Sequence, residues 1–100
     1  MVSLALTKAR NNKYEAHHIV AQAAAKASAT RLLLKKVSIS VQSSLNKVSI
    51  KYNLHGHLHT DAYYIAVHTL LKKAEGSYAK TTKTLTFIKA LLLAASSKTP

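Results

Sequence analysis

Histidines are the side chains in this sequence best suited to chemistry, and five of the six fall in two short groups. His17 and His18 are adjacent in the stretch EAHHIVAQ, while His55 and His59 are four residues apart in HGHLH. On a helix, a spacing of four places two rings on one face, within reach of one metal ion. A third imidazole would complete a three-histidine site with an open coordination position, which is what catalysis by a metal requires. His68 has no partner at a useful spacing and is expected on a helix face or at the surface.

The adjacent pair of histidines can divide two tasks between its rings. If His17 turns toward the second group as the third ligand, His18 points another way, because neighbouring residues face different directions. A neutral imidazole near a metal-bound phosphate suits a general base that takes the proton from an attacking water. Each motif alone is weak, since isolated histidine pairs more often pack or form hydrogen bonds. His57 and His59 are an alternative ligand pair, but the helical spacing favours His55 with His59.

Short strands are expected to carry the first histidine group and the segment before the second. Residues 13–20 are expected to form a strand that contains the adjacent pair. Val48 and Ile50 alternate with polar residues after Asn46, a strand pattern, and a similar alternation over residues 37–41 predicts another extended segment.

Helices make up most of the remaining chain. Alanine- and leucine-rich sequence without glycine or proline predicts a helix over residues 21–36. A helical period runs from residue 54 to residue 74 and stops at Gly76, and a last helix covers about residues 78–96. Residues 1–12 read as a short lead-in. No repeat or linker divides the chain, so we expect an α+β, mostly helical fold and a single domain over residues 1–100.

The composition points to a polyanionic partner. Fifteen Lys and Arg residues stand against three Asp and Glu residues, a net charge of +12. Such a charge favours nucleic acid or an anionic membrane. The chain has no cysteine, which excludes disulfides and thiolate metal sites, and it lacks an uncharged apolar run long enough to span a membrane. A non-catalytic, histone-like nucleic-acid-binding protein is the main alternative to an enzyme, and a membrane-active domain built on residues 78–96 is a second one.

The order of these motifs resembles the AHH nucleases. These are toxin domains of the HNH (ββα-metal) endonuclease superfamily, found at the C-termini of bacterial polymorphic toxins, and the nuclease colicins are similar in the same core elements. The resemblance spans about residues 14–71 and rests on four motifs in order: AHHIVAQ, the triplet from Asn46 to Val48, LHGHLHT, and the pair Tyr63–Tyr64. It implies a β-hairpin and a helix wrapped around one divalent metal, with this core over about residues 14–75.

The resemblance also assigns roles by position. His17, His55 and His59 match the metal ligands, and His18 matches the general base. Asn46 matches the asparagine that fixes the loop holding the base through backbone hydrogen bonds. Read alone, Asn46 is only a turn residue before a strand.

The implied activity is metal-dependent hydrolysis of phosphodiester bonds, in DNA or alternatively RNA. No element reads bases, so we expect low sequence specificity. An imidazole-only site favours zinc as the tightest ion, with magnesium, manganese or nickel as possible working ions. Lys13, Lys47 and Lys51 are the basic residues closest in the expected hairpin, and His57 either contacts a phosphate or faces solvent. Resemblance and charge together imply an acidic immunity protein as partner and a bacterial effector, secreted or delivered into the cytoplasm of a target cell.

Overall fold

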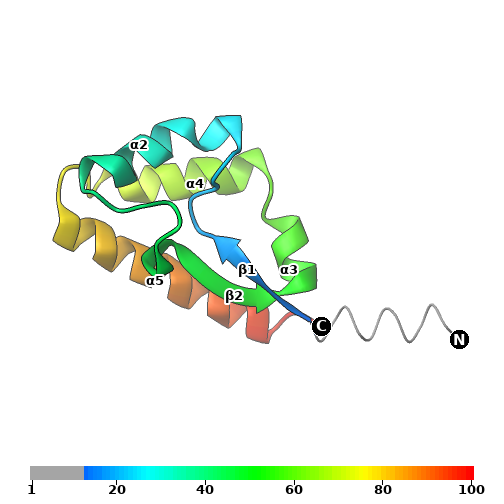
Figure 1. Cartoon of the computed structure of the whole chain (residues 1–100). Coiled ribbons are helices and arrows are strands. Elements are labelled where there is room, and N and C mark those ends of the chain that lie inside the picture. The colour runs from blue at the N-terminus through cyan, green and yellow to red at the C-terminus, as the bar shows by residue number, and fades with distance from the viewer. Residues whose placement is uncertain (1–12) are drawn as a thin grey trace, which may run out of the picture.

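Two short strands and several helices form a small α+β fold, as the sequence predicted (Figure 1). The computed structural model describes residues 13–100, so the lead-in expected over residues 1–12 lies outside the described part of the chain. The elements in chain order are β1 (Tyr14–His18), the 3-10 turn η1 (Ala25–Ala27), α2 (Ser28–Lys36), the 3-10 turn η2 (Ser44–Asn46), β2 (Lys47–Lys51), α3 (Tyr52–His57), α4 (Asp61–Lys72) and α5 (Tyr78–Ser97).

The strands β1 and β2 pair in antiparallel fashion, with Tyr14 opposite Lys51 and His18 opposite Lys47. They are not joined by a tight turn. The chain leaves β1, runs through α2 and returns to β2 (Figure 1). Residues 19–46 therefore separate the two paired strands along the sequence. The pairing continues past the strand ends, where the Ile19 amide donates to the Asn46 carbonyl at 2.8 Å. The first histidine pair is therefore held at the end of a sheet.

Residues 37–41 do not form the extended segment that their alternation predicted, because they terminate α2 instead. The Ser38 amide donates to the Lys35 carbonyl at 3.0 Å, and the Ile39 amide donates to the Leu34 carbonyl at 3.0 Å. This pair of bonds is a Schellman cap, in which the residue after the helix adopts a left-handed conformation. Ser38 occupies that position with φ of 60°. Ile39 is buried as the apolar residue that follows such a cap, so its burial reflects helix termination and not a strand.

The two central helices also differ from their predicted lengths. Regular α-helix begins at Ser28 and not at residue 21, because the chain before it makes tertiary hydrogen bonds that an α-helix would not allow. The helix expected over residues 54–74 is two helices, α3 and α4. The Thr60 hydroxyl accepts from the Tyr63 amide at 3.2 Å, and Asp61 lies in the first turn of α4. A threonine cap followed by an acidic residue is a helix start, and it ends the earlier helix.

Helices cover the sheet on more than one side (Figure 1). The helices α2 and α4 lie side by side, and α5 packs along β2 on the opposite side of the molecule (Figure 1). The Lys51 amide donates to the Ser96 hydroxyl at 2.9 Å, which ties the end of α5 to the sheet. One buried apolar cluster joins these layers: Ile19, Val20, Leu33, Leu34, Ile39, Val48, Ile50, Val67, Leu71, Leu85, Ile88 and Leu92. None of the described helices has the length and apolar character needed to cross a bilayer.

Candidate functional site

Three histidines from different elements converge at the end of the sheet. His17 comes from β1 and is only 2% exposed, His55 comes from α3, and His59 lies between α3 and α4. One ring nitrogen from each lies within 4.8 Å of those of the other two. The Nε2 atoms of His55 and His59 are 3.3 Å apart. The sheet end and the helix connection thus bring together the three residues that the sequence predicted as ligands.

The convergence of His55 and His59 does not come from one helical face, as their spacing predicted. The helix α3 ends at His57, so His59 lies beyond it. The Leu58 amide donates to the His55 carbonyl at 3.2 Å, a tight turn that brings the chain back toward α3. His57 is exposed and is not part of the cluster, so the alternative pair of His57 with His59 does not form.

A tyrosine hydroxyl fixes the ring of His17. The Tyr63 hydroxyl donates to the Ile19 carbonyl at 2.7 Å, and it lies 2.8 Å from the His17 Nε2 atom. Because its hydrogen points at the carbonyl, this hydroxyl accepts from His17, whose proton is therefore on Nε2. The other nitrogen, Nδ1, is buried and has no hydrogen-bond partner among the described residues. It offers a lone pair toward the other two histidines.

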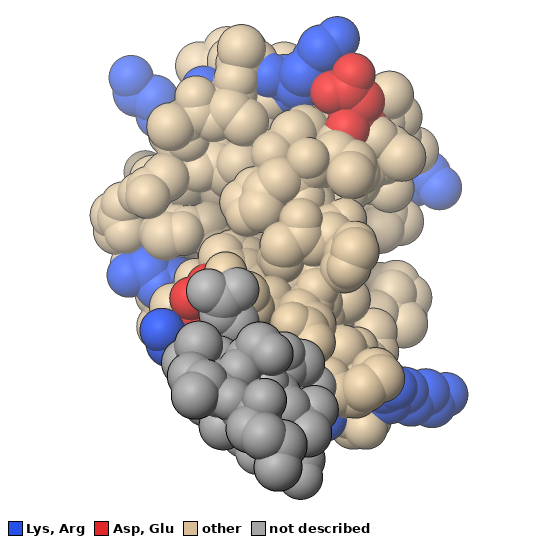
Figure 2. Space-filling model, turned by 90° about the vertical axis from the view of Figure 1, so that its right-hand side faces the viewer, with Lys and Arg blue, Asp and Glu red and all other residues tan. Residues whose placement is uncertain are grey.

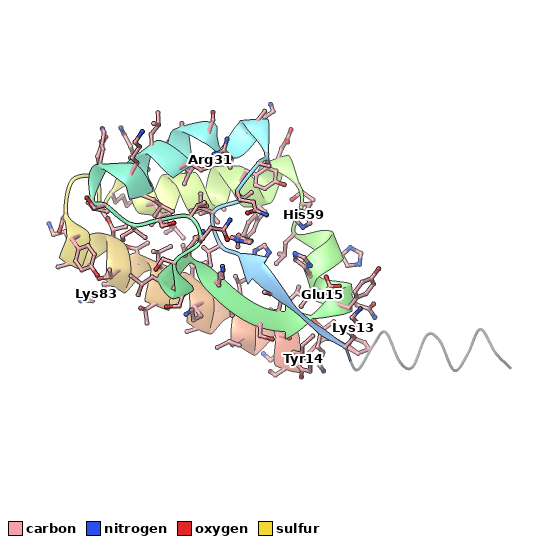
Figure 3. The ribbon with its side chains drawn as sticks, viewed as in Figure 1. Lys13, Tyr14, Glu15, Arg31, His59 and Lys83 are labelled. Carbon is pink, nitrogen blue, oxygen red and sulfur yellow. The ribbon has the colours of Figure 1, made fainter. Side chains whose placement is uncertain are left out.

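The other two histidines have polar partners of their own. The Glu15 carboxylate accepts from the His55 Nδ1–H at 2.8 Å, which leaves the His55 Nε2 atom unprotonated in the neutral ring. The His59 Nδ1 atom lies 3.4 Å from the Tyr64 hydroxyl. Figure 3 shows Glu15 and His59 on the α3 side of β1. Metal-binding histidines usually have such partners on the nitrogen that faces away from the ion.

The nitrogens fit a divalent metal by their chemistry, and the pair from His55 and His59 fits it by spacing as well. A tetrahedral zinc site with Zn–N bonds of about 2.0–2.1 Å has ligand nitrogens roughly 3.3–3.4 Å apart. The His55–His59 distance of 3.3 Å matches that spacing. A buried imidazole nitrogen without a partner, as in His17, is costly unless something binds it. His17, His55 and His59 could therefore hold one ion.

Burial sets the ionisation of the two inner groups. The pKa of His17 is lowered to about 4, mainly by desolvation on burial and to a smaller extent by the neighbouring imidazoles of His55, His59 and His18. His17 is thus neutral at physiological pH, the form that binds metals. Burial raises the pKa of Tyr63, so its hydroxyl keeps the proton that it donates to the Ile19 carbonyl.

His18 lies at the end of β1, and its ring is oriented by a glutamine. The Gln42 Oε1 atom lies 3.0 Å from the His18 Nε2 atom, and an amide oxygen can only accept. The proton of neutral His18 is therefore on Nε2, and Nδ1 is free to accept a proton. Gln42 is held in turn by the side chain of Gln22.

Asn46 fixes the chain that follows His18. Its side chain is fully buried, its Oδ1 atom accepts from the Val20 amide at 2.8 Å, and its Nδ2 atom donates to the Val20 carbonyl at 3.1 Å. The same Nδ2 atom donates to the Val41 carbonyl at 2.9 Å. These bonds hold the loop beside the histidine pair, which is the role that the family resemblance implied for Asn46.

The histidines open onto a pocket of about 380 Å³. Small side chains from the loop after β1 form one wall, and the histidines form the other. The lining residues are Ala16, His17, His18, Ala21, Gln22, Ala23, Ala24, His55, His59 and Tyr64. The pocket therefore presents His18 and the three converging imidazoles to one bound group. On the α3 side of the molecule the surface is mostly neutral, with basic side chains around its margin (Figure 2).

The other predicted site residues lie at different distances from this pocket. Lys47 pairs with His18 across the strands, so its side chain lies on the same face beside it. Lys13 is exposed just before β1. The Lys51 ammonium donates to the Thr99 carbonyl at 2.7 Å, which directs it toward the C-terminus and away from the histidines. The Nδ1 atom of His68 bonds the Thr30 hydroxyl at 2.8 Å, so it has a partner that sequence spacing did not reveal.

Four residues of the site had no such role in the sequence analysis. Glu15, Gln42, Tyr63 and Tyr64 each contact one of the histidines through a side chain. Glu15 had one available signal: two residues before His17, it shares a strand face with the buried ligand. Gln42 had none, because only the return of the chain from α2 brings it to His18.

Comparison with protein families places the chain in a known nuclease family. A family model described as a nuclease family of the HNH/ENDO VII superfamily with conserved AHH matches residues 4–94. A search of curated proteins found no match. A search of solved structures found none either.

Proposed function

This chain belongs to the AHH nuclease family of the HNH/ENDO VII superfamily, and on that premise we propose that it is a metal-dependent endonuclease. It hydrolyses phosphodiester bonds, in DNA as the first candidate and RNA as the second, without sequence preference. The observation that carries the proposal is the convergence of three imidazole nitrogens beside His18. The net charge of +12 agrees with binding of the nucleic acid backbone.

Three nitrogens would hold the ion: Nδ1 of His17 and Nε2 of His55 and His59. When bound there, a divalent ion supplies Lewis-acid stabilisation of the charge that develops on the phosphate and on the leaving oxygen. An imidazole-only set favours zinc or another transition metal over magnesium. Glu15 and Tyr63 keep the ring protons on the outer nitrogens of His55 and His17, so that the inner nitrogens stay available.

His18 acts on the water. Its Nε2–H is directed at Gln42, so Nδ1 takes a proton as the water oxygen attacks phosphorus and the bond to the leaving 3′ oxygen breaks. Asn46 holds the adjoining loop by its three side-chain hydrogen bonds. It therefore positions His18 without contacting the substrate.

The test compares wild type with His17→Ala, His18→Ala and His57→Ala on DNA and RNA, with metal and with chelator. We expect His17→Ala to weaken zinc binding in calorimetry. We expect His18→Ala to keep bound zinc but to lose cleavage by about 10²- to 10⁴-fold, the range for a positioned general base. His57→Ala, an exposed histidine outside the cluster, is the matched control and should cleave as wild type does.

Two outcomes would contradict the proposal. Full cleavage in His18→Ala would remove the general-base role. Retarded but intact nucleic acid with every ion would favour a non-catalytic, histone-like binder.

The toxin role is part of the same proposal. Family membership and the charge of +12 support a bacterial effector delivered into a target cell and neutralised by an acidic immunity protein. Expression of wild type and His18→Ala in the cytoplasm of a bacterium tests toxicity. If both variants are equally toxic, the nuclease is not the cause.

A further inference from the structure

A second hollow, of about 540 Å³, lies between the C-terminal half of α2 and the segment that follows it. It is lined by Arg31, Lys35, Ser38, Ile39, Ser40 and Val41, and we refer to it as the Arg31–Lys35 groove. We propose that this groove binds backbone phosphates of the nucleic acid on one side of the phosphate that is cleaved. The proposal rests on the proposed nuclease function and adds a path for the substrate strand.

The groove adjoins the histidine pocket along two separate contacts. Arg31 donates from Nη1 to the carbonyls of Ala21 and Ala24, at 2.9 and 2.8 Å, and both alanines line the histidine pocket. On the other side, the Gln42 amide donates to the Ser40 hydroxyl at 3.1 Å, while the Gln42 side chain contacts His18. The two hollows therefore lie next to each other, on either side of these contacts. A strand with a phosphate at the histidines can continue into the groove.

The lining has the charge and the donors that a phosphate needs. Arg31 uses one guanidinium nitrogen for the two carbonyls, which leaves the N–H groups of its other nitrogens for a ligand. Lys35 is exposed and makes no ion pair or side-chain hydrogen bond within residues 13–100. Ser38 and Ser40 add hydroxyls, and no acidic residue lines the groove. Arginine and serine are common contacts to backbone phosphates, as is lysine.

Lys35 differs from three other lysines of the described helical segments, which have acidic partners. Lys36 and Lys72 both contact Glu75, and the ammonium of Lys26 lies 3.8 Å from Asp61. Those three charges are partly neutralised within the protein. A lysine without an acidic partner among the described residues, lining the same groove as an arginine, is better suited to bind the substrate than those three. Contacts to phosphate alone do not distinguish one base from another, which agrees with the proposed cleavage without sequence specificity.

The test measures the salt dependence of DNA binding, which counts phosphate contacts. The protein carries His18→Ala and is kept in chelator, so that no cleavage interferes, and fluorescence anisotropy reports binding of a labelled oligonucleotide. Lys35→Gln is compared with Lys83→Gln, which removes the same charge from α5, an element that contributes no residue to the lining of the groove. Each lost phosphate contact lowers the slope of log affinity against log salt by about 0.7 for single strands and 0.9 for duplexes.

We expect Lys35→Gln to lose one such contact and Lys83→Gln to lose none. The deficit of Lys35→Gln relative to wild type should therefore shrink by about threefold between roughly 50 and 200 mM salt. With His18 restored and metal present, Lys35→Gln should raise KM for an oligonucleotide. It should not change the hydrolysis of bis(4-nitrophenyl) phosphate, which is too small to reach the groove.

The outcomes separate this proposal from the proposed function. If wild type cleaves nucleic acid but Lys35→Gln and Lys83→Gln show equal slopes and equal KM, the phosphate-binding role of the groove is wrong. The proposed nuclease function is then unaffected. If Lys35→Gln also slows hydrolysis of the small substrate, Lys35 acts on the histidine site itself, and the phosphate-binding role of the groove is again wrong. If wild type neither binds nor cleaves nucleic acid, both proposals fall together.

Discussion

The hydroxyl of Tyr63 gives the sharpest test of how the histidine cluster is held. It accepts from the His17 ring at 2.8 Å and donates to the Ile19 carbonyl at 2.7 Å. Tyr63→Phe removes this oxygen and keeps the ring, so packing is largely unchanged. Two groups lose their partner at once: an N–H on a side chain that is 2% exposed, and a carbonyl of a fully buried residue.

The expected magnitude follows from those two losses. Leaving a buried donor or acceptor unpaired costs about 1–3 kcal/mol, so the two losses in Tyr63→Phe should lower the free energy of unfolding by roughly 2–6 kcal/mol. A small protein has about 5–15 kcal/mol in total, so the loss is a large fraction of its stability. Substitution of a residue that orients a metal ligand weakens binding of the metal by roughly 10- to 100-fold. Zinc affinity should fall by a factor in that range.

Urea unfolding in chelator measures the first effect, and calorimetric titration with zinc measures the second. With a slope of about 2 kcal/mol per molar urea, the midpoint should drop by roughly 1–3 M. Tyr64→Phe is the matched control, because its hydroxyl lies 3.4 Å from the ring of the exposed His59. Its unfolding free energy should change by less than about 0.5 kcal/mol. Equal effects of the two substitutions on unfolding would refute the conclusion that the Tyr63 hydroxyl holds the ring of His17.

Two further predictions concern backbone strain and pH. Ser38→Gly should raise the free energy of unfolding by about 0.5–1 kcal/mol in urea, because φ of 60° strains a residue with a Cβ. Ser40→Gly is the control and should lower the free energy of unfolding. Destabilisation by both substitutions would contradict backbone strain at Ser38. The pKa of His17 is lowered to about 4 from 6.5, so between those pH values the unfolded chain binds a proton that the folded chain does not. In chelator, unfolding free energy should therefore fall as pH drops through this window, by up to about 3 kcal/mol, and His17→Gln should show a smaller fall. The same slope in both proteins would contradict this.

The sequence was most informative where local chemistry decides the structure. Alternation of Val48 and Ile50 predicted β2, and an apolar period free of glycine predicted α5 almost to the residue. The spacing of His55 and His59 predicted that the two residues converge on one helix. They converge, but across a helix boundary, because Thr60 caps a new helix within the longer apolar period.

Contacts between distant parts of the chain could not be predicted from local sequence patterns. The alternation of residues 37–41 imitated a strand, because a Schellman cap also buries one residue and exposes its neighbours. Alanine-rich residues 21–24 have a strong helical propensity, but the carbonyls of Ala21 and Ala24 accept from Arg31 instead. The bonds from Asn46 to Val20 and Val41 likewise depend on the return of the chain. Family resemblance supplied this residue where periodicity could not.

The excursion of residues 19–46 between the paired strands has a consequence for the order of folding. Closing a loop of about 28 residues costs roughly 2 kcal/mol more in chain entropy than closing a two-residue turn. Helices such as α5 can form from local contacts before that cost is met, whereas His17 meets His55 only after β1 finds its place beside the later chain. A chain emerging from an unfolded state would therefore gain most of its helix before it gains an assembled histidine cluster. Catalytic competence is thus among the last properties that this protein acquires as it folds.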